Sequence, residues 1–283
     1  MYRACVTDIN RDLAASLRLC GPAMLVSGNG TVVPQISNQV IAILTKKHPC
    51  QQEEDAEADE ELEESSEYDW LVIDTALDVV VCLSAALGPN FAELWKIFEK
   101  PILKYASSQE SVERSTAVGT IAECIGTMGD AVTPFTSGLL KVLLHRLGDQ
   151  DPDTKANAAY GIGLLCEKSG NQQEILKNYN TILGKLEPLL HNQQSNRILD
   201  NSAGCVARMI TKHPNNVPIT EVLPRLVEIL PLREDHEENK PVYNMIVTLC
   251  KSYPKLLRQP PFSDWFEQQI KRAMRLSGNL LPV

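Results

Sequence analysis

Carboxylates are the most concentrated chemical groups in this chain of 283 residues. Ten of the fifteen residues from Glu53 to Glu67 are acidic, namely Glu53, Glu54, Asp55, Glu57, Asp59, Glu60, Glu61, Glu63, Glu64 and Glu67. Such a run attracts cations and basic protein segments, and its self-repulsion predicts a disordered loop over residues 50–67. The other 26 Asp and Glu residues are balanced by 27 Lys and Arg residues. The formal charge of -9 is therefore local.

Residue types that could perform catalysis or hold a metal lack the necessary spacing. The eight cysteines include no CxxC pair and no Cys/His cluster at zinc spacing. HExxH and GxSxG are absent, and Gly28 and Gly30 form only a lone GxG. The sequence also lacks the Lys/Arg-rich stripe that nucleic acid needs and the apolar run of about 18 residues that a membrane span needs. We expect a protein without cofactor, metal or enzymatic activity, which binds neither nucleic acid nor membrane.

The elements that must position these groups are repeated. Three segments align without gaps: DWLVIDTALDVVVCLSAALG, ESVERSTAVGTIAECIGTMG and DPDTKANAAYGIGLLCEKSG. They end at Gly88, Gly129 and Gly170, which is typical of a left-handed residue that terminates a helix. Two further copies end at Pro214 and Pro254, and RACVTDINRDLAASLRLCGP is similar to a sixth. The recurring Cys82, Cys124 and Cys166 lie in apolar stripes, and we interpret them as core residues.

A second set of helices is predicted between these copies. Apolar residues recur at i, i+3, i+4 and i+7 in residues 33–48, 89–106, 133–149, 171–192 and 219–232. A unit of two helices cannot bury both of its faces alone, so neighbouring units must stack. The sequence therefore predicts an all-α fold, an α-solenoid of about six antiparallel helix pairs in a right-handed superhelix, with residues 1–283 as a single domain.

The second helix of each pair leaves polar residues on the side opposite its core stripe. In the copy that ends at Gly170, the core stripe contains Ala158, Ile162 and Leu165. The candidate binding residues opposite it and in the next two copies are Asn157, Tyr160, Asp200, Asn201, Glu237 and Glu238. Secondary candidates are Asp74, Asp78, Glu113 and Asn239.

These residue types suit an extended basic peptide. Carboxylates compensate a lysine ammonium, an asparagine carbonyl accepts hydrogen bonds, and a tyrosine ring packs against the alkyl stem. The alternative is that they are solvated or capping residues, because Asp and Asn are favoured where helices begin. Tyr160 has no capping role. Trp70 fits either the core or the binding surface, and Trp265 belongs to the last helix.

Four stretches carry a resemblance to a known family. They are EYDW after the acidic run, RSTAVGTIAECIGTMGDAVTPF, DPDTKANAAYGIGLLCEKSG and LPLREDHEEN. Over roughly residues 33–254 the chain resembles the importin-β (karyopherin-β) nuclear transport receptors, which consist of HEAT repeats, and is most similar to the importin-four type. The prolines within the first helices, Pro101, Pro188 and Pro224, fit the HEAT pattern. The resemblance implies that the chain is a C-terminal fragment of a longer receptor.

The resemblance also implies a function and partners. The first helix of each pair (the A helix) lies outside, and the second (the B helix) lines a concave surface that binds Lys-rich nuclear localisation segments of histones, of the H3 and H4 type, or of ribosomal proteins. Nucleoporins and the GTPase Ran are partners of the full-length receptor, which shuttles between cytoplasm and nucleus as a monomer. The alternative function is a HEAT-repeat scaffold or histone-chaperone-like protein. The acidic run falls between A helix 33–48 and B helix 68–87, which predicts an accessory role in attracting basic cargo.

Overall fold

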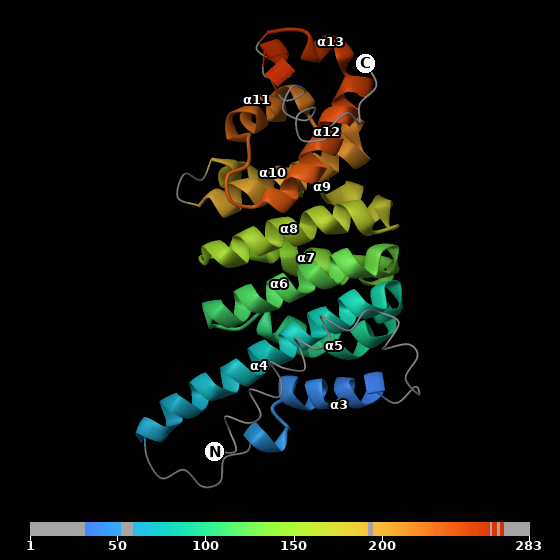
Figure 1. Ribbon diagram of the computed structural model, residues 1–283. Coiled ribbons are helices and arrows are strands. Elements are labelled where there is room, and N and C mark those ends of the chain that lie inside the picture. The colour runs from blue at the N-terminus through green and yellow to red at the C-terminus, as the bar shows by residue number, and fades with distance from the viewer. Residues whose placement is uncertain (1–31, 52–58, 192–194, 261, 265–266, 269–283) are drawn as a thin grey trace. The chain divides into compact units, whose positions relative to one another are not determined.

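The computed structural model describes residues 32–51, 59–191, 195–260, 262–264 and 267–268, which are coloured in Figure 1. All regular structure in these ranges is helical, as the repeats predict. The chain divides into two compact units, one formed by residues 1–146 with 168–170 and the other by residues 147–167 with 171–283. The copy that begins at Arg3, the GxG at Gly28 and Gly30, and Trp265 lie outside the described residues.

The first unit has an A layer and a B layer. The A layer contains α3 (Val32–Leu44), α5 (Phe91–Tyr105) and α7 (Thr136–Arg146), and the B layer contains α4 (Asp59–Leu87) and α6 (Ser111–Met128). Helix α4 packs along α6, and α3 packs on α5 (Figure 1). Three short 3-10 segments connect them, namely η1 (Pro49–Gln51), η2 (Gly88–Asn90) and η3 (Gly129–Phe135).

The second unit repeats this arrangement. Its B helices are α8 (Pro152–Lys168), α10 (Asn196–Lys212) and α12 (Asn239–Ser252), and its A helices are α9 (Gln172–Leu190) and α11 (Ile219–Ile229). The remaining elements are η4 (Pro214–Asn216), η5 (His236–Glu238) and α13 (Pro254–Leu257). Helix α10 is central and contacts α9, α11 and α12. Each helix predicted within the described ranges is present, and Pro101, Pro188 and Pro224 lie inside A helices as expected.

The start of α4 differs from the prediction. The sequence predicts a loop over residues 50–67, yet Cys50 and Gln51 belong to η1 and the helix already begins at Asp59. Glutamate and leucine favour helices, and acidic side chains near a helix N-terminus interact favourably with its dipole. These local preferences outweigh the mutual repulsion of the carboxylates. Residues 52–58, with Glu53, Glu54, Asp55 and Glu57, lie outside the described part of the chain.

The two layers contribute different side chains to the core. In the first unit, α5 buries Phe91, Trp95 and Phe98, with the two phenylalanine rings stacked at 6.0 Å between centroids. The B helices bury aliphatic side chains such as Ile73 and Ile121 together with small residues, including Cys82 and Cys124. Burial raises the pKa of the Cys124 thiol to about 12, and that of Cys166 in the second unit likewise to about 12. A protonated, enclosed thiol is unreactive, which supports the core interpretation.

Two of the three repeated glycines have the predicted conformation. Gly88 and Gly129 have φ of 55° and 59°, where a side chain is strained. Gly170 does not have a positive φ. Its backbone N–H instead donates to Thr133 Oγ1 at 2.8 Å, so this helix end is fixed by a side chain of its own unit.

A buried ion pair joins the B helices of the second unit. The Arg208 guanidinium on α10 makes a two-pronged contact with the Glu238 carboxylate, in which Nη2 lies 2.8 Å from Oε1 and Nη1 contacts Oε2. The Arg208 side chain is 7% exposed and that of Glu238 is 1% exposed. Arg208 Nε also donates to Glu167 of α8 at 3.0 Å. Burial lowers the pKa of Arg208, but the hydrogen bonds and charge of Glu238 raise it by more, so Arg208 stays charged.

Gly204 makes room for this pair. A Cβ at Gly204 would lie 1.5 Å from Glu238 Oε2 and 2.5 Å from its carboxyl carbon. No side chain fits there while Glu238 remains in place. The missing side chain is therefore a condition for the buried carboxylate.

One apolar stretch, Asp69–Tyr105, is long and apolar enough to cross a membrane by length and composition alone. In the structure this stretch is the second half of α4, the turn η2 and helix α5, and half of its apolar window is buried. A core helix of a soluble protein passes the same test, so the stretch is weak evidence for a membrane span.

Replacing Gly129 by alanine tests the helix end. We expect G129A to destabilise the first unit by about 1–3 kcal/mol, because alanine is strained at φ 59°, ψ -134°. The control is G138A in α7, where a Cβ meets only Glu99 Oε1 at 3.8 Å; alanine should stabilise there by up to ~1 kcal/mol. Urea denaturation of the two variants measures both effects, and equal stabilities would contradict the assignment.

Replacing Gly204 by alanine tests the buried ion pair. The methyl group should expel Glu238 and destabilise the second unit by roughly 3–5 kcal/mol, because Arg208 then loses its buried partner. Hydrogen exchange of the α10 and α12 backbone amides measures this loss of stability. The control is G184A in α9, where a Cβ meets nothing within 4 Å. The double variant G204A/E238A should be no less stable than E238A alone; additive losses would contradict this account.

Candidate functional site

The six residues predicted as the main binding pocket lie in the second unit, but three of them are buried. Asp200, Asn201 and Glu238 are almost fully enclosed. Asp200 Oδ2 accepts hydrogen bonds from the backbone N–H groups of Arg233, Glu234 and Asp235 at 3.1, 2.7 and 2.9 Å. It therefore holds the segment between α11 and α12 against α10. The expectation that these three side chains line an accessible surface is wrong, because packing of the chain itself occupies them.

The other three residues, Asn157, Tyr160 and Glu237, differ in their exposure to solvent and in their contacts. Asn157 Oδ1 accepts a hydrogen bond from Arg197 Nη2 at 2.7 Å. Tyr160 is half-buried, and the Arg208 guanidinium carbon lies 5.6 Å from its ring centroid. Glu237 is exposed on the short segment η5. Cation–π contact with a neighbour inside the chain thus already uses one face of the ring.

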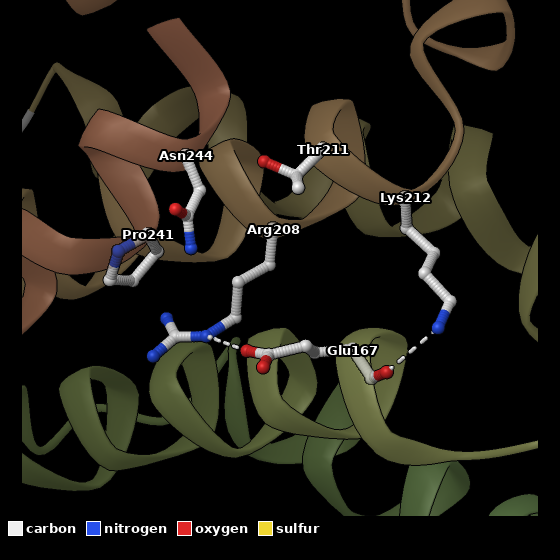
Figure 2. A pocket seen from close by; sticks show the side chains of 6 residues that line it. All are labelled: Glu167, Arg208, Thr211, Lys212, Pro241 and Asn244. Atoms are coloured by element: carbon white, nitrogen blue, oxygen red, sulfur yellow. Dashed lines mark hydrogen bonds and ion pairs between the residues drawn. The ribbon is translucent and has the colours of Figure 1, made fainter. Parts of the chain in front are cut away.

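The cations of α10 face the hydrogen-bond acceptors of α8. Arg197 Nη1 lies 2.7 Å from Asp153 Oδ1, Arg208 Nε lies 3.0 Å from Glu167 Oε2, and Lys212 Nζ donates to the Glu167 carbonyl at 3.1 Å. Figure 2 shows the last two contacts at the rim of a small pocket of about 80 Å³. The pocket is lined by Glu167, Arg208, Thr211, Lys212, Pro241 and Asn244. Acceptors on this side of α8 are thus paired with cations of the same unit.

A signal for the buried pair is present in the sequence. Arg208 stands alone in the run NSAGCVARMI, in which every other residue is small or apolar. A lone charge within such a run requires a buried partner. The partner itself, 30 residues away, is not indicated by any local pattern.

The secondary candidates in the first unit lie together where α4 and α6 pack side by side. A hydrogen bond from Thr116 on α6 reaches Asp74 on α4, and the Ser84 and Thr127 hydroxyls are hydrogen-bonded further along. The two contacts join residues 42 and 43 positions apart, so the helices run in the same direction. Asp78 follows Asp74 by one turn and is exposed. Asp74, Asp78, Glu113 and Thr116 form what we call the α4–α6 surface.

The surroundings of Asp74 on this surface disfavour its charged, carboxylate form. Burial raises the pKa of the Asp74 carboxyl, the nearby Asp78 carboxylate raises it further, and the hydrogen bond from Thr116 offsets only part of this. Burial raises the pKa of Tyr105 to about 12, with added effects from the charges of Glu113 and Asp69. A bound cation would relieve the repulsion between the carboxylates.

Three further predicted residues can be placed. Asn239 donates its side-chain amide to the His236 carbonyl at 2.8 Å and so stabilises the turn η5. Trp70 is half-buried, and its ring is tilted against Tyr105 with 6.2 Å between centroids. Of the acidic run, Asp59 to Glu67 form the first turns of α4.

Comparisons with known proteins identify relatives by sequence. No family model matches the chain. It is 37% identical over 229 residues to a "Probable importin subunit beta-4" of Schizosaccharomyces pombe, which covers 78% of this chain and 21% of that protein. It is 33% identical over 255 residues to "Importin-4" of Homo sapiens, covering 89% of this chain and 23% of the relative. The chain thus spans about a fifth of the length of these relatives.

Solved structures of similar fold include designed repeat proteins. A designed armadillo repeat protein in complex with the peptide (KR)4 has a TM-score of 0.56 and 16% sequence identity, covering 84% of this chain and 90% of that one. A second designed armadillo repeat protein has a TM-score of 0.51 and 17% identity, covering 84% and 94%. These likenesses show the fold, an all-α repeat solenoid. By sequence, the chain is homologous to the importin-4 proteins over most of its length and belongs to the importin-β family.

Proposed function

We propose that the chain is the cargo-binding part of a nuclear import receptor and that its B helices bind Lys-rich segments of histones, of the H3 and H4 type, or of ribosomal proteins. Importins are transport receptors rather than enzymes, and they shuttle between cytoplasm and nucleus. The homology supports the receptor assignment. Because the chain spans about a fifth of its relatives, binding of Ran and nucleoporins belongs to the proposal for the full-length receptor.

The observation that carries the proposal is the half-buried carboxylate Asp74 beside Asp78 on the α4–α6 surface. Burial raises the pKa of the Asp74 carboxyl most and the Asp78 carboxylate raises it further, so a cation bound between the two carboxylates would offset their repulsion.

Apolar side chains complete the chemistry for lysine. Leu71 on α4 and Val112 on α6 are exposed, and these are the two helices that carry the carboxylates. A lysine combines an ammonium group with a long alkyl stem, which gains from apolar contact. Carboxylates for the ammonium and exposed aliphatic groups for the stem are therefore both available on α4 and α6.

The fold itself supports a peptide ligand of this kind. The armadillo repeat protein that resembles this chain is described in complex with (KR)4, a peptide of alternating lysine and arginine. That likeness concerns the fold alone and says nothing of individual residues. It supports the proposal because a stacked helical surface offers regularly spaced positions to an extended peptide. The acidic run before α4 then raises the local concentration of basic cargo.

Discharging the α4–α6 surface tests the proposed function. We expect D74N/D78N to bind a histone-tail peptide roughly tenfold more weakly at low salt, because two charge-assisted contacts are lost. The wild-type affinity should fall as salt rises, and the variant should depend less on salt. Isothermal titration calorimetry at two salt concentrations measures both.

The matched control removes two exposed carboxylates from A helices. E93Q/E187Q has the same net charge as D74N/D78N, but its changes lie in α5 and α9. We expect its affinity to stay close to that of the wild type. An equal loss of peptide affinity in both variants would show that the effect depends on net charge alone. Unchanged affinity of D74N/D78N would rule out the α4–α6 surface as the binding site. Equal binding of peptides with and without basic residues would favour the scaffold alternative.

A further inference from the structure

A pair of hydrogen-bond acceptors on α8 is occupied by a cation from the same chain. The Arg197 guanidinium of α10 donates from Nη1 to Asp153 Oδ1 and from Nη2 to Asn157 Oδ1, both at 2.7 Å. Asp153 and Asn157 are one helical turn apart, so a single planar group spans both. A carboxylate and an amide oxygen at this spacing form a receptor for one guanidinium or ammonium group.

Capping of the α8 N-terminus does not explain why this acceptor pair is present. The carboxylate that caps the start of α8 belongs to Asp151, whose Oδ2 accepts from the Thr154 backbone N–H and from the Thr154 hydroxyl, each at 2.7 Å. Asp153 is left free of that duty, and its contact is with the neighbouring helix. Both acceptors of the pair contact a cation of the neighbouring helix.

Arg197 differs from the other arginine of α10 in how firmly it is held. The Arg197 side chain is 39% exposed and that of Asp153 is 61% exposed, whereas Arg208 is buried. An ion pair that is exposed to water contributes little to stability, so one of its partners is readily replaced by another charged group. A buried, two-pronged pair is costly to break. An incoming lysine or arginine can thus displace Arg197 but not Arg208.

We propose that Arg197 is a specificity-determining residue, an internal cation that occupies the Asp153–Asn157 pair until a basic side chain of a partner replaces it. The inference rests on the proposed function. On α4 and α6, the exposed side chains of Leu71 and Val112 are aliphatic rather than cationic. The first unit therefore accepts basic segments directly, and the second accepts only those whose charge can outcompete Arg197.

The experiment measures binding of the peptide (KR)4 by calorimetry to the wild-type chain and to variants in the D74N/D78N background, in which Asp74 and Asp78 carry no charge. In that background, R197A should bind two- to fivefold more tightly than its parent, the size expected for removal of an exposed competing pair. The control K185A removes one exposed positive charge from α9 and should leave the affinity unchanged. Adding D153N should abolish the gain from R197A.

The outcomes separate the two proposals. Binding by the wild type with no gain from R197A, or an equal gain from K185A, overturns the role of Arg197 and leaves the proposed function standing. A gain that persists in the presence of D153N also overturns it. Absence of (KR)4 binding by the wild type, by R197A and by every other variant overturns the proposed function together with the inference. Tighter binding by R197A that requires Asp153 supports the inference.

Discussion

Close stacking of the B helices is the constraint on which the rest of the structure depends. Neighbouring B helices pack through buried alanine and cysteine together with aliphatic side chains such as Ile73 and Ile121, while the A helix α5 supplies large aromatic side chains such as Trp95. Such a helix has one stripe committed to the core and another left in solvent. Any polar group near the border of the two stripes must be paired within the chain or available to a ligand. The chemistry of each unit follows from which of these two solutions its residues adopt.

The two units solve this problem differently. In the second unit, arginines of α10 pair with Asp153, Glu167 and Glu238, and Asp200 is enclosed by backbone N–H groups. In the first unit, Asp74 and Asp78 repel each other on one face of α4, with a threonine hydroxyl as the hydrogen-bond partner of Asp74. Removing negative charge from the second unit would disrupt internal bonds, whereas a cation added to the first would relieve repulsion. This difference is why we propose the α4–α6 surface as the primary contact with basic cargo.

The repeat pattern predicted the helices and the core from sequence, but it could not separate buried from accessible carboxylates. Helix periodicity and the recurrence of Cys82, Cys124 and Cys166 are local signals, and they identified the layers and the buried stripe. Asp200 and Glu238 carry the same carboxyl group as Asp74, yet tertiary partners enclose them. The position of Gly204 opposite Glu238 depends on how two helices meet, which no single segment encodes.

The central claim is that basic segments bind first at the α4–α6 surface, and zero-length cross-linking tests it most directly. A carbodiimide joins a lysine ammonium to a carboxylate only when the two are in contact, so mass spectrometry of the chain with a bound Lys-rich peptide locates the ammonium groups. The account predicts cross-links at Asp74 and Asp78, with further links in the acidic run, and none at Glu93 or Glu187 of the A helices. Cross-links confined to the A helices or to the acidic run would contradict it.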